Sequence, residues 1–198
     1  ALAFGGIVPP GVTRTASTES WNGSIWSTEN NLNTARNALG GAGANSTSAL
    51  AFGGSVPPST TATEEWNAGI ALGAWYTGGN MNTARFGLGG AGTQTAALAF
   101  TGDTTLGPGT EAYTGATEGY NGTAWAELND MNSARNRLAS AGTTQTAALA
   151  SGGSTTTPTG ATESWNGLSW TEVNDLNTPR TYLQGAGTAT ASLSFGGS

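Results

Sequence analysis

Residues 85–128 read RFGLGGAGTQTAALAFTGDTTLGPGTEAYTGATEGYNGTAWAEL, one complete copy of a pattern that fills the 198-residue chain. The copy begins with Arg85 and a Gly/Ala-rich run, and it continues through an alternating segment at Ala96–Gly102. It closes with Glu118-Gly119-Tyr120-Asn121 and Trp125. Because self-similarity at a fixed period identifies repeat architectures, the repeat has to be interpreted before any single residue.

The other copies hold the same residue types at nearly constant spacing. The motif arginine recurs at Arg36, Arg85, Arg135 and Arg180, so its spacings are 49, 50 and 45 residues. The motif glutamate recurs at Glu19, Glu64, Glu118 and Glu163. The first aromatic position holds Trp21, Trp66, Tyr120 and Trp165, and the second holds Trp26, Trp75, Trp125 and Trp170. We expect one domain over residues 1–198, with units at 1–35, 36–84, 85–134 and 135–179 and with residues 180–198 completing the first unit.

Each unit reads as four short antiparallel strands. Alternation of small and large residues at Ala96–Gly102 and again at 116–120 is typical of half-buried strands. Asn121-Gly122 then predicts a two-residue type I′ hairpin leading to Ala124–Leu128. The Gly/Ala run at Leu88–Gly92 suits an innermost strand, where crowded backbones leave room only for small side chains.

Four such units, of about 45–50 residues each, predict an all-β fold, a β-propeller with four blades of four antiparallel strands. The alternatives are a β-solenoid or a fragment of a longer propeller array. The Phe-Gly-Gly-like strand end occurs five times, at 3–6, 51–54, 99–102, 150–153 and 194–197, which is one more than four blades need.

The order of the motif residues resembles the kelch repeat family. The matching elements are a Gly-Gly doublet closing a strand, then Glu-x-Trp/Tyr-Asn, then a second Trp and an Arg. The doublet is found at Gly5-Gly6, Gly53-Gly54, Gly152-Gly153 and Gly196-Gly197, and Thr101-Gly102 replaces it in the third unit. The resemblance covers the whole chain and implies a propeller. The low-complexity repeated sequence, such as TESWNG at 18–23 and 162–167, resembles repeat arrays in bacteriophage structural and fibre proteins.

Composition excludes several classes of function. Charged residues make up 9 %, the net charge is −6, and Lys, His and Cys are absent, so the chain is a poor partner for nucleic acid. No apolar run is long enough for a membrane helix, so no membrane insertion is expected.

Without His or Cys the usual triads and thiol mechanisms cannot be built, and we expect no enzyme activity. A carboxylate-based glycan hydrolase would need two facing acids, and no distinctive pair stands out. No cofactor is expected; Ca²⁺ is the metal that carboxylates and carbonyls would suit, but no calcium-loop spacing is present.

Residues locked to the period are predicted to be scaffold. Each motif Arg would bond backbone carbonyls or the motif Glu, and the aromatic residues would fill the space between blades. The alternatives are an anion-binding ring of arginines and sugar-stacking tryptophans. A ligand site is expected instead in the loops where units differ, namely 7–14, 55–60, 103–115 and 154–160, with the insertion at 69–73. The longest of these holds the candidate ligand residues Asp103, Glu111 and Tyr113.

The sequence therefore predicts a non-enzymatic structural or adhesive module of a larger assembly, such as a phage fibre or virion appendage. Its location would be extracellular or virion-associated. Its partners would be other subunits of the assembly or cell-surface glycans. The alternative is a lectin-like propeller that binds glycans through its variable loops.

Overall fold

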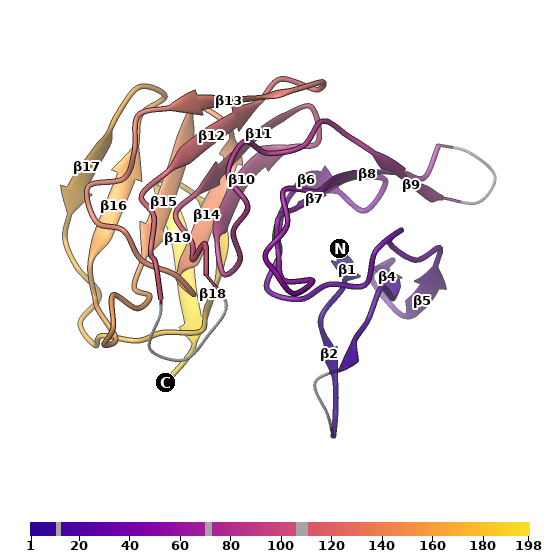
Figure 1. Ribbon diagram of the computed structural model, residues 1–198, viewed down its shortest axis with the longest axis horizontal. Coiled ribbons are helices and arrows are strands. Elements are labelled where there is room, and N and C mark those ends of the chain that lie inside the picture. Colours follow the sequence, from indigo (N-terminus) through magenta and orange to yellow (C-terminus); the bar gives the residue numbers. More distant parts are fainter. Residues whose placement is uncertain (11–12, 70–72, 106–110) are drawn as a thin grey trace.

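The structure, a computed structural model, describes residues 1–10, 13–69, 73–105 and 111–198 (Figure 1). All regular secondary structure in these residues is β-strand, in 19 strands, and this confirms the all-β class. The strands pair antiparallel throughout.

Three units form complete four-stranded sheets, each a meander of consecutive strands. The first consists of β6 (Gly40–Asn45), β7 (Ser48–Phe52), β8 (Thr63–Asn67) and β9 (Ala74–Thr77). The second consists of β10 (Gly89–Thr93), β11 (Ala96–Phe100), β12 (Thr117–Tyr120) and β13 (Trp125–Leu128). The third consists of β14 (Ala139–Thr144), β15 (Ala147–Ser151), β16 (Thr162–Trp165) and β17 (Trp170–Val173). Pairing lies within each unit, as in propeller blades, and the strands of successive units are not hydrogen-bonded into one sheet.

The two ends of the chain form incomplete sheets. At the N-terminal end, β1 (Leu2–Phe4), β4 (Thr18–Trp21) and β5 (Trp26–Glu29) make a three-stranded sheet. A hairpin of β2 (Ile7–Val8) and β3 (Thr13–Arg14) extends from it. At the C-terminal end, β18 (Leu183–Thr188) pairs only with β19 (Ala191–Gly196).

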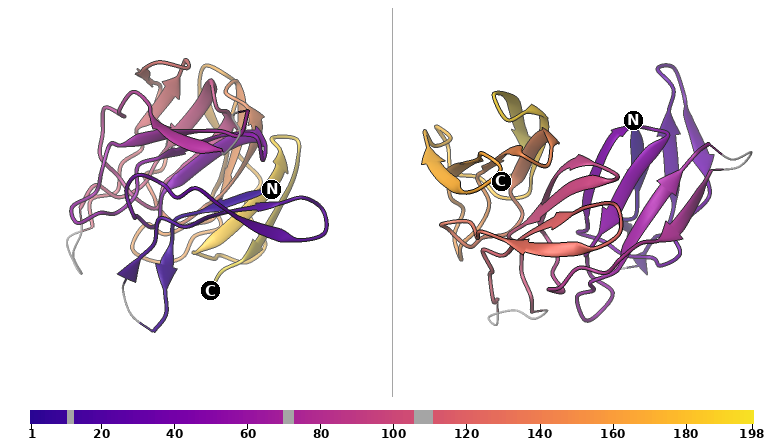
Figure 2. Two further views of the ribbon diagram at one scale, coloured as in Figure 1. Left: turned by 90° about the vertical axis from the view of Figure 1, so that its right-hand side faces the viewer. Right: turned by 90° about the horizontal axis from the view of Figure 1, so that it is seen from above.

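The described residues thus contain three four-stranded sheets and not the four that the sequence predicts, and the strands expected for the fourth lie in two separate sheets (Figure 2, right). Residues 180–198 form no hydrogen-bonded sheet with β1, β4 and β5, and their completion of the first unit stays a prediction.

The first strand of each unit lies innermost. β6 packs beside β10, β10 beside β14, and β14 beside β18. These four strands, the inner strands, line a central cavity of about 320 Å³. The four sheets that contain them follow one another along the chain from purple to yellow in Figure 1.

In two of the complete sheets, the ring on the second strand requires a glycine on the inner strand. A Cβ added to Gly40 would lie 2.3 Å from Cε2 of Phe52, its cross-strand partner, and Gly89 stands in the same relation to Phe100. In the third complete sheet Ala139 takes the glycine position, and its cross-strand partner is Ser151. In the three complete sheets the larger inner residue therefore occurs where the opposing side chain is small. In β18 the equivalent residue is Gln184, and it lies opposite Phe195, whose side chain is 45 % exposed.

Aromatic residues fill the space between neighbouring sheets. Phe52 packs edge-on against Trp125 of the next sheet, with ring centroids 5.0 Å apart. The same contact joins Phe4 to Trp75 and Phe100 to Trp170. Rings of this size bury on the order of 150–250 Å² each, so these contacts supply much of the apolar burial between sheets.

The Asn-Gly hairpins are present, but the predicted type I′ turn is wrong. Of Asn121 and Gly122, only Gly122 has a positive φ. The loop consists of the four residues that lie between the paired residues Tyr120 and Trp125. Asn121 closes this loop with its side chain, because its Oδ1 accepts hydrogen bonds from the backbone N–H groups of Thr123 and Ala124. An asparagine that bonds the backbone two residues ahead forms a turn without needing positive φ itself.

Candidate functional site

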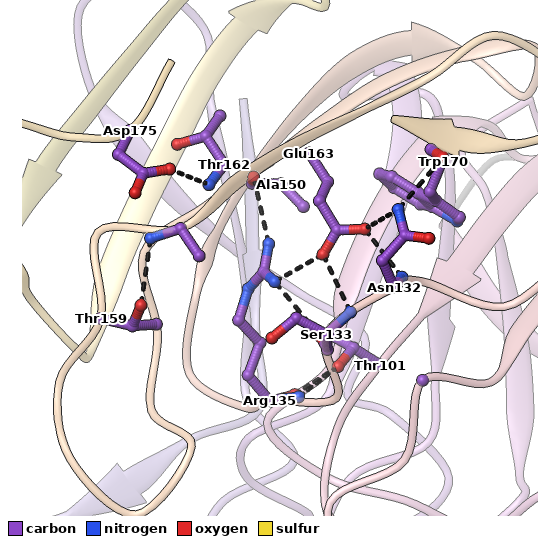
Figure 3. A network of polar contacts seen from close by, with 12 residues as sticks. Thr101, Asn132, Ser133, Arg135, Ala150, Thr159, Thr162, Glu163, Trp170 and Asp175 are labelled. Atoms are coloured by element: carbon purple, nitrogen blue, oxygen red, sulfur yellow. Dashed lines mark hydrogen bonds and ion pairs between the residues drawn. The ribbon is translucent and has the colours of Figure 1, made fainter. Parts of the chain in front are cut away.

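The motif arginine and glutamate form a buried ion pair in each complete sheet. Nη1 of Arg135 lies 2.7 Å from Oε1 of Glu163, and both side chains are almost fully buried (Figure 3). The same guanidinium also donates to the carbonyls of Ser133 and Ala150. Equivalent pairs join Arg36 to Glu64 at 3.1 Å and Arg85 to Glu118 at 3.0 Å.

The second carboxylate oxygen is also used. Oε2 of Glu163 accepts hydrogen bonds from the backbone N–H and the side-chain amide of Asn132, just before the arginine (Figure 3). Asn82 donates to Glu118 with the same two groups. Asn33 donates to Glu64 with its backbone N–H alone, and its side-chain amide donates to the carbonyl of Trp75. We call each Arg–Glu pair with its Asn the Arg–Glu lock, because it fixes the segment that enters a sheet onto the third strand of that sheet.

The lock also connects neighbouring sheets. The carbonyl of Arg135 accepts from the N–H of Gly102, which ends the second strand of the preceding sheet. Thr101 takes the place of the first doublet glycine and keeps its left-handed backbone, at φ 56°. Its hydroxyl donates to the carbonyl of Arg135 and accepts from the N–H of Arg135. This extra bond accounts for a threonine at a position that otherwise holds glycine.

Burial dominates the electrostatics of these arginines. Removal from water lowers the pKa of Arg36 and of Arg85, while Glu64 and Glu118 act in the opposite direction. The Nη groups of these guanidinium groups donate hydrogen bonds to carbonyls and carboxylates inside the protein. The Nε of each of these arginines is buried without a hydrogen-bond partner in the part of the chain that the structure describes. Because the side chains are buried and their Nη groups are bonded inside the protein, they cannot serve as an anion-binding ring, and the geometry gives these arginines a structural environment.

In the described ranges, the motif arginine and the motif glutamate nearest the two chain ends are not in such a pair. Arg180 donates to the carbonyls of Gly196 and Ser194, as the other motif arginines do to their own second strands, but no carboxylate pairs with it among the described residues. Glu19 is exposed, and it forms no ion pair there either.

Most of the motif aromatic residues lie in the core. Trp66, Tyr120 and Trp165 are buried. Each second-position indole in a complete sheet donates from Nε1 to a threonine of the preceding sheet, namely Trp75 to Thr18, Trp125 to Thr63 and Trp170 to Thr117. The N-terminal pair departs from this pattern, because Trp21 is only half-buried and Trp26 is 50 % exposed.

The predicted ligand residues share one loop but differ in exposure. Asp103 is 1 % exposed, and its Oδ1 accepts from the N–H groups of Thr105 and Ala112, so its carboxylate shapes the loop. Tyr113 bridges to Asp103 and is half-buried, while Glu111 is exposed. Residues 106–110 of this loop lie outside the described residues, and ligand binding by these three side chains stays a prediction.

The remaining variable loops are partly structured. The loop at 7–14 contains the β2–β3 hairpin, from which Arg14 donates to Asn37 and to Ser55 of the next sheet. Residues 11–12 of this loop and residues 70–72 of the insertion at 69–73 lie outside the described part of the chain. The loops at 55–60 and 154–160 each contain an isolated bridge, Ser55 to Ser59 and Ser154 to Pro158.

Two residue pairs were not singled out from the sequence. The Tyr120 hydroxyl donates to Oε1 of Glu65 on the neighbouring sheet at 2.5 Å. Burial and this bond raise the pKa of Tyr120 to about 12. The guanidinium of Arg137 lies 4.6 Å from the ring centroid of Tyr182. In both pairs the two residues depart from the repeat, and this shared departure is the signal that could have found them.

The acidic side chains are dispersed through the fold. No three His, Cys, Asp or Glu side chains in the described ranges are grouped in a way that could hold a metal ion. Those ranges also contain no helix that could cross a membrane. In comparisons with known proteins, no protein-family model matches the chain, and no curated protein sequence matches it significantly.

Proposed function

We propose that this chain is a non-enzymatic structural or adhesive β-propeller module of a larger assembly, such as a phage fibre or virion appendage. The observation that supports this proposal most is the use of the repeated charges. Three of the six arginines and their three glutamates are paired in buried locks, and the backbone carbonyls of the same arginines accept hydrogen bonds from the preceding sheets. Side chains that are buried and paired in this way stabilise the sheets, and they are not available for chemistry on a substrate.

The proposed architecture is a ring of four blades in which the two chain ends complete one another. In support of this, the ends carry complementary halves of the repeated contacts. Arg180 without a carboxylate and Glu19 without an arginine would make the fourth lock. Trp26, exposed at its indole, and Thr162 would make the fourth Trp–Thr hydrogen bond, since Thr162 corresponds to Thr18, Thr63 and Thr117.

Closure of the ring has one cost. β1 and β19 hold the same position in the repeat, so one of them must leave its sheet when β18 and β4 become parts of one blade. Closure of the ring would bury Glu19 and Trp26 against the C-terminal part of the chain. Their equivalents in the complete sheets are buried. The proposed location is extracellular or virion-associated, and the proposed partners are other subunits of the assembly.

Antibody labelling of intact particles or cells of the source tests the assembly role. Label on an external appendage is the expected result, and label confined to the cell interior would contradict the proposal. In parallel, the purified chain is incubated with a panel of polysaccharides and the products are analysed by mass spectrometry. No shortening of any glycan is expected, and turnover that depends on the chain would overturn the non-enzymatic role.

A lectin-like function is the second candidate, favoured by exposed aromatic residues on β5 and β9. Trp26 and Tyr76 are each 50 % exposed, and such rings are able to stack on sugars. A glycan array tests this candidate with the wild-type chain and with a variant in which residues 103–113 are replaced by the shorter equivalent loop 154–158. Binding that the loop variant loses would support the lectin role. Absence of binding by the wild type would eliminate it.

A further inference from the structure

One repeat position gathers four different residues at one end of the inner strands. The residues two places after each motif arginine are Ala38, Gly87, Arg137 and Tyr182. All four have left-handed backbone, with φ of 51°, 63°, 56° and 57°. Backbone hydrogen bonds link the first three in order, since Gly87 donates to the carbonyl of Ala38 and Arg137 donates to that of Gly87. The N–H of Leu183, next to Tyr182, donates to the carbonyl of Arg137.

The identity of these residues is not explained by the backbone. Glycine adopts this conformation without strain, and Gly87 is the residue that a purely structural position would hold. A non-glycine residue with this backbone costs on the order of 1–2 kcal/mol, and residues held in this way cluster at ligand sites. Arginine and tyrosine at two neighbouring copies therefore call for a reason beyond the turn itself.

These residues surround a small cavity. The cavity measures about 200 Å³ and is lined by the four residues, by the leucine that follows each of them, and by Gln184. We call it the mouth pocket, because its leucines Leu39, Leu88, Leu138 and Leu183 also line the central cavity between the inner strands. Its volume is below the ~300–1,000 Å³ of pockets for drug-sized ligands, so it suits a ligand of about one sugar unit.

The pocket offers one cation and one aromatic ring. Arg137 stacks on Tyr182, which is 60 % exposed, and its side chain makes no ion pair with the described residues. Unlike the motif arginines, it is only partly buried, and none of its side-chain N–H groups is hydrogen-bonded in the described part of the chain. A planar guanidinium that an aromatic ring holds in one orientation is able to donate two parallel hydrogen bonds to a carboxylate.

We propose that the mouth pocket binds a carboxylate-bearing sugar unit of the hexuronate class. Arg137 pairs with the carboxylate, while Tyr182 and the leucines contact the apolar face of the sugar ring. This inference goes beyond the proposed structural role, because the pocket is built from the residues that lead into β6, β10, β14 and β18 and from the start of β18, whether or not the chain ends close a ring.

The test is a titration of the full chain with glucuronate, followed by NMR chemical-shift changes or calorimetry, with glucose as the neutral match. Saturable binding of glucuronate, and none of glucose, is expected. Arg137→Gln should weaken the binding at least about tenfold, since a hydrogen-bonded charge is lost. Circular dichroism and the denaturation midpoint of Arg137→Gln confirm that the variant is folded. Arg14→Gln, which removes an arginine that does not line the pocket, should leave the affinity unchanged.

Three outcomes would overturn the proposal. One is a folded wild-type chain that glucuronate does not perturb. Another is equal affinity in the wild type and in folded Arg137→Gln. The third is acetate or an acidic peptide binding as tightly as glucuronate, because the sugar ring would then contribute nothing specific. A failure of this kind would leave the assembly role untouched, since that role is measured by labelling of intact particles.

Discussion

Glu163 on β16 accepts a 2.7 Å hydrogen bond from Arg135, and the two buried side chains connect the entrance of a sheet to its third strand. Removing one partner leaves a buried charge without compensation, which typically costs about 3–5 kcal/mol. We therefore expect Glu163→Ala to lower the free energy of unfolding by about that amount, measured by chemical denaturation. Glu172 lies directly opposite on β17 and is exposed, so Glu172→Ala should change stability by less than about 0.5 kcal/mol. Equal effects of the two variants would contradict the structural role of the lock.

The proposed fourth lock predicts coupling between residues far apart in the sequence. Glu19→Arg and Arg180→Glu should each destabilise the chain, and the double variant should recover part of the loss. The expected coupling free energy is on the order of 1–3 kcal/mol. Thermal or chemical denaturation of the four proteins gives this value, and sedimentation shows whether the pair forms within one chain or between copies. Glu172→Arg combined with Arg180→Glu has the same net charge but should show no coupling. Strict additivity in the Glu19–Arg180 cycle would refute closure by this pair.

The Tyr120–Glu65 hydrogen bond predicts a decline in stability at alkaline pH. The folded protein holds the pKa of Tyr120 at about 12, above the ordinary value of 10.0, because burial and Glu65 favour the neutral phenol. A raised pKa of this kind contributes stability that is complete below pH 10 and is lost as the pH rises from about 10 to 12. Denaturation midpoints measured across this range should fall more steeply in the wild type than in Tyr120→Phe. The exposed Tyr76 offers a matched position, and Tyr76→Phe should keep the wild-type decline.

The contact between Gly40 and Phe52 predicts a conditional effect of a single methyl group. Gly40→Ala places its Cβ against the Phe52 ring and should destabilise the chain by about 1–3 kcal/mol through overpacking. Phe52→Ser is itself destabilising, but in that background the additional cost of Gly40→Ala should disappear. Ala139 opposite Ser151 is the natural example of the tolerated combination. The same penalty in both backgrounds, measured by chemical denaturation, would show that the ring does not set the inner-strand residue.

Local features of the fold were predictable where the repeat controlled them. The alternation at Ala96–Gly102 predicted β11, and the Gly/Ala run predicted the inner strand β10, because both patterns follow from a strand's period and from crowding. The Asn-Gly hairpins were predicted, but the turn type was not, since the Asn121 side chain substitutes for the positive φ of a type I′ turn. Thr101 retains a glycine conformation through bonds to Arg135 that only the folded neighbour supplies.

Functional residues were harder to identify. Asp103 stood out because it breaks the repeat, yet its carboxylate is occupied by the backbone of its own loop. Arg137 and Tyr182 lie 45 residues apart in the sequence, and no spacing within one unit connects them. They meet because the same repeat position of successive units converges around the inner strands.

The sequence by itself determined that the chain is built from repeated antiparallel strands, with a charged pair and an aromatic pair in every unit. It could do so because strand period, turn chemistry and repetition are local properties. Only the tertiary structure decided which of the repeated side chains are satisfied. Arg36, Arg85 and Arg135 are paired because the third strand of the sheet that each one enters supplies a glutamate. Arg180 and Glu19 instead lie near opposite ends of the array of sheets. Their difference arises from position in the assembly of sheets, since burial and pairing depend on neighbours that sequence distance does not specify.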